Sequence, residues 1–187
     1  MPPARRLAAS RSALTAASAA LASASCSAAF AAQALHWFAE DGAGAEIARV
    51  LGPGGALVAL WNCRDQHRGG AWLQAYERVI ESAYAPDTPS WLSRRWETWA
   101  RGSALFEQPP ALMRWERDAG GHVGDAATML NAAMSISEIA RAPPDARRRF
   151  EDRLRAAIAL APRLPGGGDR ILMPMFTEAL VLRVAAA

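Results

Sequence analysis

The sequence predicts a doubly wound α/β fold, and three neighbouring segments support this prediction. Apolar residues recur at helical spacing over 43–51, directly after Asp41, which can cap a helix. Gly52–Gly55 then ends that helix, since glycine tolerates the left-handed conformation and the intervening proline cannot continue the helix. Residues 56–61 follow as an unbroken apolar run, typical of a strand covered on both faces. Helix, turn and buried strand in this order are characteristic of an α/β sheet.

The remaining elements follow from hydrophobic periodicity and from turn residues. Strands are predicted near 28–33, 56–62, 111–117 and 171–183, and Pro174 should interrupt the last of them. Further helices are predicted at 71–84, 90–101, 124–133 and 144–161. The helix at 90–101 contains three tryptophans, which we expect in the core, with a substrate lid as the alternative.

Length and composition favour one globular domain. The chain has 187 residues, of which 51% are hydrophobic and 21% charged, a balance that supports a core and excludes disorder throughout. All 21 basic residues are arginine, and the net charge is +3. Because acidic residues alternate with arginines, as at 151–153, no basic stripe forms and we expect no nucleic-acid partner.

The cysteines and histidines show no metal-binding pattern. Cys26 and Cys63 form no CxxC pair, and the three histidines have no metal-ligand spacing. We therefore expect two free thiols, no metal ion and a reducing compartment. The sequence contains no recognisable nucleophilic triad, so catalytic residues remain unassigned.

Residues 1–27 differ in composition from the rest. They are rich in alanine and serine and contain three arginines, while the first acidic residue of the chain is Glu40. This pattern resembles a mitochondrial or chloroplast transit peptide; a secretory signal, a low-complexity leader or sequence upstream of a truncated gene are alternatives. We expect no membrane span, because the uncharged stretch is mostly alanine and serine. Without a working transit peptide, the expected location is the cytoplasm.

Two motifs carry a resemblance to a known family. Residues 31–38 have the sequence AAQALHWF, and residues 46–62 have the sequence EIARVLGPGGALVALWN. Their order resembles the fourth strand, following helix and fifth strand of class I S-adenosylmethionine-dependent methyltransferases. More narrowly, the pattern resembles the type 11 subgroup, which includes trans-aconitate-methyltransferase-like enzymes. SISEIA at 135–140 and MPMFTE at 173–178 are similar to the last part of that subgroup.

The resemblance covers only the C-terminal half of the family's domain. It implies a truncated methyltransferase domain at 28–187, a partial Rossmann-like sheet of family strands 4, 5, 7 and 6 with flanking helices. The N-terminal strands 1–3 would be missing. By the same analogy the strand at 171–183 is antiparallel and lies between the strands at 56–62 and 111–117. The strand at 28–33 would then be an edge, and we expect self-association through it.

The resemblance also implies a function and a site. The function is S-adenosylmethionine-dependent methyl transfer to a small molecule. In the family, the loop after the fourth strand lies beside the cofactor, and ligands of open α/β sheets bind beyond the carboxyl ends of the strands. Carried over, the expected contacts are cofactor binding by Ala32, Gln33, His36 and Trp37, and substrate binding by Trp61 and Asn62. The alternative for His36 and the two tryptophans is ordinary packing.

The family's glycine-rich cofactor turn has no counterpart here. In the family this turn follows the first strand, and an acidic residue after the second strand binds the ribose. All glycine clusters of this chain follow the segment assigned to strand four. We therefore expect impaired cofactor binding. The alternative function is a non-catalytic methyltransferase remnant or interaction module.

Overall fold

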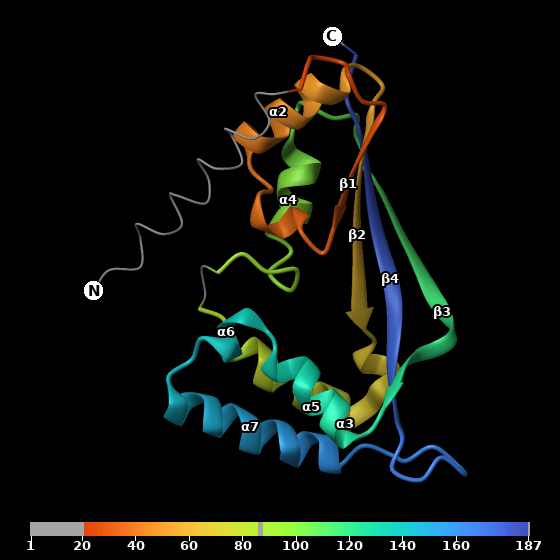
Figure 1. Ribbon diagram of the computed structural model, residues 1–187. Coiled ribbons are helices and arrows are strands. Elements are labelled where there is room, and N and C mark those ends of the chain that lie inside the picture. Colours follow the sequence, from red (N-terminus) through yellow and green to blue (C-terminus); the bar gives the residue numbers. More distant parts are fainter. Residues whose placement is uncertain (1–20, 86–87, 187) are drawn as a thin grey trace. The chain divides into compact units, whose positions relative to one another are not determined.

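The structure is a computed structural model that describes residues 21–85 and 88–186. It contains a mixed α/β arrangement of one sheet and flanking helices, which confirms the predicted fold class (Figure 1). The strands are β1 (Ala28–Ala32), β2 (Ala56–Arg64), β3 (Ala111–Gly124) and β4 (Ile171–Arg183). The helices are the 3₁₀ helix η1 (Leu35–Trp37), α2 (Asp41–Leu51), α3 (Gln66–Glu81), α4 (Arg95–Gly102), α5 (Ala126–Met134), α6 (Ser137–Ala140) and α7 (Pro144–Ala159).

The sheet has the strand order β1-β2-β4-β3 (Figure 1). β1 and β2 are parallel, with Ala28 opposite Ala56 and Ala32 opposite Leu60. β4 runs the other way. The N–H of Val184 donates to the carbonyl of Gly55 beside the start of β2, and the N–H of Asp65 donates to Pro174 beside its end. The predicted insertion of an antiparallel last strand is therefore confirmed, and β1 is an edge strand of the described sheet.

The chain divides into two compact units. The first contains the described residues of Met1–Trp61, Pro89–Met113 and Glu178–Ala187, and the second contains those of Asn62–Thr88 and Arg114–Thr177. The boundaries between the units fall inside β2, β3 and β4.

In the first unit, β2 alternates between buried and more exposed side chains. Leu57, Ala59 and Trp61 are buried, as expected when successive side chains of a strand point to opposite faces. α2 ends where predicted, at Gly52, whose φ of 69° is the left-handed conformation that glycine favours. The predicted cap was wrong. Glu40 is the N-cap, whereas Asp41 is already helical and accepts a hydrogen bond from the indole N–H of Trp99.

The second unit has a mostly aliphatic core between α3, α5 and α7, which also contains Trp72 and Tyr76. Leu73, Met129 and Leu154 are fully buried in it. The hydroxyl of Tyr76 donates a 2.8 Å hydrogen bond to the carbonyl of Met129, so α3 and α5 are joined by a buried polar contact as well as by packing.

α3 begins earlier than the predicted helix at 71–84. Its N-cap is Asp65, whose carboxylate accepts hydrogen bonds from the backbone N–H groups of His67 and Arg68. Gly70 interrupts the helix with a φ of 67°. The periodicity of the sequence becomes regular only after this kink, which explains the late prediction.

β3 and β4 also differ from the prediction. β3 extends to Gly124 instead of ending near 117, and β4 continues through Pro174 without interruption. Gly121 of β3 lies against this part of β4, since a Cβ on it would overlap the Met173 carbonyl and approach the Pro174 Cα to 2.8 Å. A glycine on β3 therefore lets the two strands approach closely beside the proline.

Two smaller differences concern helices. α4 begins at Arg95 rather than at 90, after Arg94 with a left-handed φ of 49°. The short helices η1 and α6 were not predicted, since three or four residues are too few to show a period.

The predicted leader at 1–27 is described only in its last residues. Residues 1–20 lie outside the described part of the chain. From residue 21 onward the backbone is tied to α2, with the N–H of Ala24 donating to Arg49 and that of Cys26 to Val50. Within residues 21–85 and 88–186, no helix has the length and apolar character needed to cross a membrane.

Candidate functional site

The first motif of the resemblance lies at the carboxyl end of β1. After Ala32, Gln33 adopts a left-handed φ of 53° while its N–H donates to the Leu60 carbonyl of β2 at 2.8 Å. This turn leads directly into η1, where the Leu35 side chain is fully buried. His36 and Trp37 are thereby fixed next to the end of the parallel strand pair, which is where ligands of open α/β sheets bind.

His36 is held by a hydrogen bond from β2. The indole Nε1 of Trp61 donates to Nδ1 of His36 at 3.2 Å. An indole N–H can only donate, so Nδ1 of His36 must present its lone pair and the ring proton must be on Nε2. Burial lowers the pKa of His36 to about 4, so the imidazole is neutral at pH 7.

Trp37 is one of the exposed aromatic side chains of the described chain. It is 48% exposed, and its ring centroid lies 5.1 Å from that of His36 with a 41° tilt. An exposed indole beside a neutral imidazole provides an apolar surface next to a hydrogen-bond donor, a combination suited to a ligand with both characters.

Trp61 lies in the core of the first unit. It is 1% exposed, and its ring centroid is 4.2 Å from that of Trp96 on α4. The guanidinium of Arg94 lies 4.7 Å from the centroid of Trp96 on the same helix end. Glu178 of β4, only 8% exposed, accepts hydrogen bonds from Arg94 and from the indole of Trp91. The sequence prediction of a tryptophan core here is supported for Trp96, but the partner role of Glu178 was missed.

Asn62, the second predicted substrate residue, belongs to the other unit. Its side chain is exposed and its Oδ1 accepts a hydrogen bond from the Thr177 hydroxyl at 3.2 Å. Because consecutive residues of a strand point to opposite faces, the side chains of Trp61 and Asn62 diverge. The structure thus brings His36, Trp37 and Trp61 together within the first unit, and Asn62 belongs to the second.

The glycines near helix starts serve local packing. A Cβ on Gly69 would collide with the Leu73 side chain, and one on Gly124 would lie 2.7 Å from Thr128. Gly44 faces the ring of Trp99 in the same way, at 2.7 Å. Toward a ligand such as S-adenosylmethionine, His36 and Trp37 offer one N–H donor and one exposed indole face.

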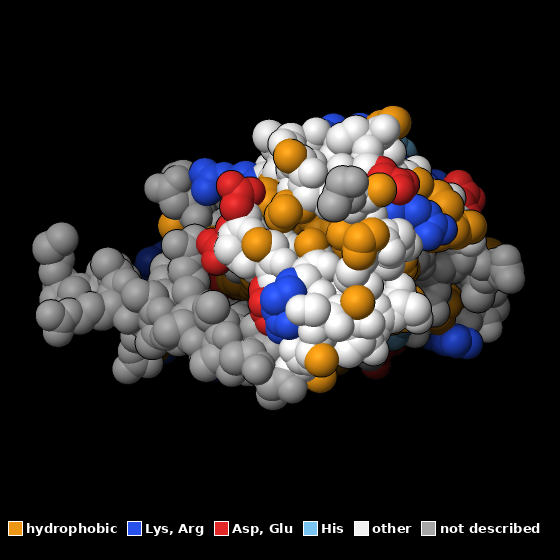
Figure 2. Space-filling view, turned by 90° about the horizontal axis from the view of Figure 1, so that it is seen from above, with side chains coloured by type: hydrophobic (Ala, Val, Ile, Leu, Met, Phe, Trp, Pro, Cys, Tyr) orange, Lys and Arg blue, Asp and Glu red, His pale blue; other side chains and the backbone are white. Residues whose placement is uncertain are grey.

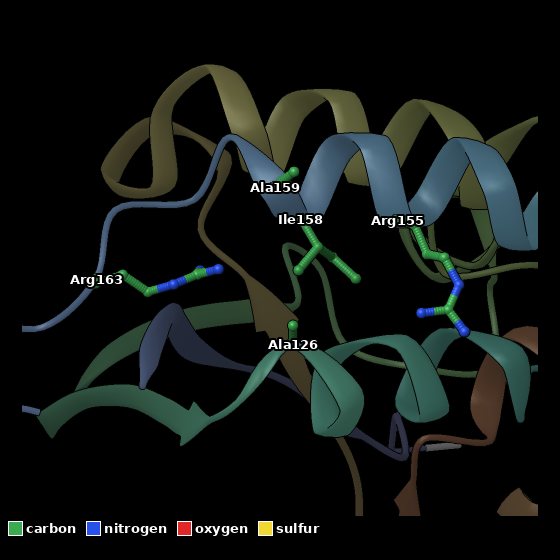
Figure 3. Close-up of a pocket in the computed structure, with 5 residues that line it drawn as sticks. All are labelled: Ala126, Arg155, Ile158, Ala159 and Arg163. Atoms are coloured by element: carbon green, nitrogen blue, oxygen red, sulfur yellow. The ribbon is translucent and has the colours of Figure 1, made fainter. Parts of the chain in front are cut away.

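A pocket of about 180 Å³ lies in the second unit (Figure 3). Ala126, Ile158 and Ala159 form its apolar lining, and Arg155 and Arg163 complete it. Both guanidinium groups already have partners, since Arg155 bonds to Glu151 and Arg163 donates to the Ala161 carbonyl. None of the residues predicted to bind cofactor or substrate lines this pocket.

Described charged side chains of opposite sign form mixed groups on one face of the molecule. On the face shown in Figure 2, arginine and acidic side chains lie next to one another. Helical pairs such as Glu46–Arg49 and Glu97–Arg101 are examples of this arrangement. Among the described residues, no group of three histidine, cysteine, aspartate or glutamate side chains could hold a metal ion.

Comparison with known sequences finds methyltransferases. No family model matches the chain. An uncharacterized methyltransferase-like protein of Schizosaccharomyces pombe is 40% identical over 65 residues, which cover 35% of this chain and 24% of that protein. An uncharacterized methyltransferase of Mycobacterium bovis is 45% identical over 49 residues, which cover 26% of this chain and 19% of that protein. The curated relatives are named methyltransferases. The chain matches about a quarter or less of their length.

Comparison with solved structures also finds proteins named methyltransferases. A candidate type II methyltransferase of Anaeromyxobacter dehalogenans aligns with a TM-score of 0.46 and 20% identity, covering 88% of this chain and 66% of that one. A phosphoethanolamine N-methyltransferase of Haemonchus contortus, solved with S-adenosylhomocysteine, aligns with a TM-score of 0.34 and 10% identity, covering 89% of this chain and 35% of that one. The sequence relatives agree with the methyltransferase prediction, and the type 11 subgroup stays a prediction.

Proposed function

We propose that this chain forms the His36–Trp37 side of the cofactor site of a small-molecule methyltransferase that uses S-adenosylmethionine, and that the 187 residues alone bind this cofactor poorly. The observation that carries the proposal is the 65-residue segment shared at 40% identity with a protein named methyltransferase-like. The type 11 subgroup is part of the same proposal, on the strength of the motifs at 31–38 and 46–62.

The arrangement at the end of β1 is consistent with this role. S-adenosylmethionine, when bound, supplies a methyl group on a sulfonium centre, and transfer by in-line displacement depends mainly on positioning. The chain's own contribution would be the exposed face of Trp37 and the neutral His36 fixed by Trp61. Ala32 and Gln33 would contribute at the turn that ends β1. No nucleophilic side chain is required for such a reaction.

The loss of binding free energy for S-adenosylmethionine can be estimated. A glycine turn and a ribose-binding carboxylate would together make two or three charge-assisted hydrogen bonds, each worth about 1.5–3 kcal/mol. Their loss removes roughly 3–9 kcal/mol, whereas a micromolar ligand binds with only about 8 kcal/mol. The described residues therefore favour millimolar binding or weaker over a modest decrease in affinity.

Titration of the full chain with S-adenosylmethionine tests the proposal. Isothermal titration should show no micromolar binding. Two-dimensional NMR with millimolar cofactor should shift the signals of His36 and of the Trp37 indole. Trp37→Ala should abolish the His36 shift. Trp115→Ala is the matched control, because Trp115 is similarly exposed, at 49%, but lies in the second unit.

Each outcome of this titration is informative. Micromolar saturable binding would show that the chain holds a complete site and would overturn the predicted impairment. Absence of any shift at His36 and Trp37 would overturn their assignment as the cofactor side. Equal effects of Trp37→Ala and Trp115→Ala would mean that the shifts reflect non-specific contact with exposed indoles.

A second candidate function is a non-catalytic methyltransferase remnant that acts as an interaction module. The sequence favours it in one respect, since all its glycine clusters follow the segment assigned to strand four and none matches the family's cofactor turn. A methyl-transfer assay with labelled S-adenosylmethionine and a panel of small-molecule acceptors distinguishes the two. Labelled product that depends on His36 and Trp37 supports the enzyme, whereas no product together with no NMR shift supports the remnant.

A further inference from the structure

Both ring nitrogens of His36 have a defined state in the structure. Nδ1 accepts the hydrogen bond of the Trp61 indole at 3.2 Å, so its lone pair is occupied. Nε2 must then carry the proton, because a neutral imidazole has one N–H. Among the described residues, Nε2 makes no hydrogen bond. A half-buried N–H without a protein acceptor, next to the exposed Trp37, is a donor left for a ligand or for water.

The donor of this hydrogen bond has little freedom to move. The Trp61 indole is 1% exposed and stacks against Trp96, with ring centroids 4.2 Å apart. Trp96 is itself fixed, because its Nε1 donates to the Trp91 carbonyl at 3.1 Å and Arg94 covers its ring. Rotation of Trp61 away from His36 would therefore disturb the packed interior of the first unit.

We infer that Trp61 is a positioning residue that holds His36 as a hydrogen-bond donor through Nε2, directed at an acceptor atom of a bound ligand, and that His36 does not serve as a general base. A base needs a free lone pair, and the only lone pair of this neutral ring is bonded to Trp61. The ligand must accordingly offer an oxygen or nitrogen acceptor at this point. The inference rests on the proposed function only for the identity of that ligand.

Charged groups near η1 do not oppose this assignment, since each has another partner. On α4, which packs against η1, Glu97 is bonded to Arg94 and Arg101. Asp41 accepts from Trp99, and Glu178 of β4 accepts from Arg94. The cause of the low pKa of His36, about 4, is burial. Protonation would also set an N–H of the ring against the N–H of Trp61.

The tautomer of His36 can be measured without cofactor or turnover. The chain has three histidines, so ¹⁵N–¹H correlation spectra of the ¹⁵N-labelled full chain separate them readily, and His36→Gln assigns the signal. We expect His36 to show an unprotonated Nδ1 and a protonated Nε2 down to about pH 4. Trp61→Phe keeps an aromatic ring beside Trp96 but removes the donor. It should give a mixture of tautomers, because nothing then favours a lone pair on Nδ1 over one on Nε2.

Two variants control for general disruption. Trp99→Phe removes an indole N–H of the same unit that bonds to Asp41, and should leave the His36 tautomer unchanged. His36→Gln retains the geometry, because its amide oxygen can accept from Trp61 while its amide N–H₂ can donate outward. If Trp61→Phe fails to fold, the tautomer of His36 in the native chain still tests whether Nδ1 is unprotonated, as the hydrogen bond from Trp61 requires.

Ligand contact is tested separately with S-adenosylhomocysteine as the probe. Millimolar S-adenosylhomocysteine should shift the Nε2–H signal of His36 in the native chain and the corresponding amide signal in His36→Gln, but should have at least several-fold less effect on Trp61→Phe. A protonated Nδ1 in the native chain or an unchanged tautomer in Trp61→Phe would overturn the positioning role. The expected tautomer with no response to the probe would overturn the ligand contact and the proposed cofactor side, while the positioning by Trp61 would stand.

Discussion

The two units of this chain are stabilised in different ways. In the first unit, aromatic rings are joined by directed contacts, from Trp61 to His36 and from Trp61 to Trp96. In the second unit, three helices bury a core that is mostly aliphatic, around Met129 and Leu154, with Trp72 and Tyr76 as its aromatic members. Substitutions in the second unit should therefore change mainly stability, whereas those in the first unit should also change the chemical state of His36. The candidate site residues His36, Trp37 and Trp61 all belong to the first unit.

The largest expected effect is in the aliphatic core. Leu154→Ala should destabilise the chain by about 2–5 kcal/mol, because Leu154 is fully buried on α7 and its removal leaves a cavity. Leu160→Ala is the control, six residues further along the chain and 67% exposed, and should change stability by less than about 0.5 kcal/mol. Urea unfolding followed by circular dichroism measures both. Similar effects for the two variants would contradict the core assigned to α7.

The corresponding test in the first unit uses two glycines of α2. A Cβ on Gly44 would lie 2.7 Å from the rigid ring of Trp99, so Gly44→Ala should cost about 1–3 kcal/mol. Nothing lies within 4 Å of a Cβ on Gly42, so Gly42→Ala should stabilise the helix by up to about 1 kcal/mol. Opposite signs for two identical substitutions on one helix would confirm that Trp99 packs on α2. Stabilisation by both would show that it does not.

Much of the fold could be predicted from the sequence, and the reasons differ by element. The apolar run at 56–61 and the turn at Gly52–Gly55 are local signals, and both appear where expected. The order β1-β2-β4-β3 came from the family resemblance, because pairing between distant strands leaves no local signal. β4 continues through Pro174 with Gly121 close to it across the sheet, a contact that no periodicity shows.

For the site, the sequence indicated the candidate residues. It did not indicate their hydrogen bonds or the tautomer of His36. The motif at 31–38 drew attention to His36, and the end of the apolar run drew attention to Trp61. Their hydrogen bond, and hence the tautomer, depends on the left-handed turn at Gln33, which brings η1 back over β2. The burial of Glu178 against Arg94 likewise requires the fold.

A smaller effect concerns the pH dependence of stability. The pKa of His36 is about 4 in the folded chain and near 6.5 when unfolded, so the unfolded chain binds the proton first. The stabilising contribution is therefore complete above pH 6.5 and is lost as the pH falls toward 4. His36→Gln should flatten the decline of stability over this window relative to the native chain. Trp115→Phe changes an exposed side chain of the second unit without altering any ionisable group, so it is the control and should keep the native slope. Equal slopes in all three chains would contradict the buried, neutral His36.

The smallest expected effect on folding stability comes from a substitution on β1, which should mainly change the association of two copies of the chain. β1 is an edge of the described sheet, and Phe30 on it is 71% exposed. Edge strands present unpaired backbone groups, so we propose that two copies of the chain associate through β1. Phe30→Lys should shift the concentration for association upward while changing folding stability by less than about 0.5 kcal/mol, because a lysine at an edge opposes pairing and loses little burial. Light scattering across a concentration series measures the shift, with Leu160→Lys as an exposed control in the second unit. A native chain that remains monomeric at high concentration would contradict the proposal. An equal shift in both variants would instead assign the association to added charge rather than to the edge.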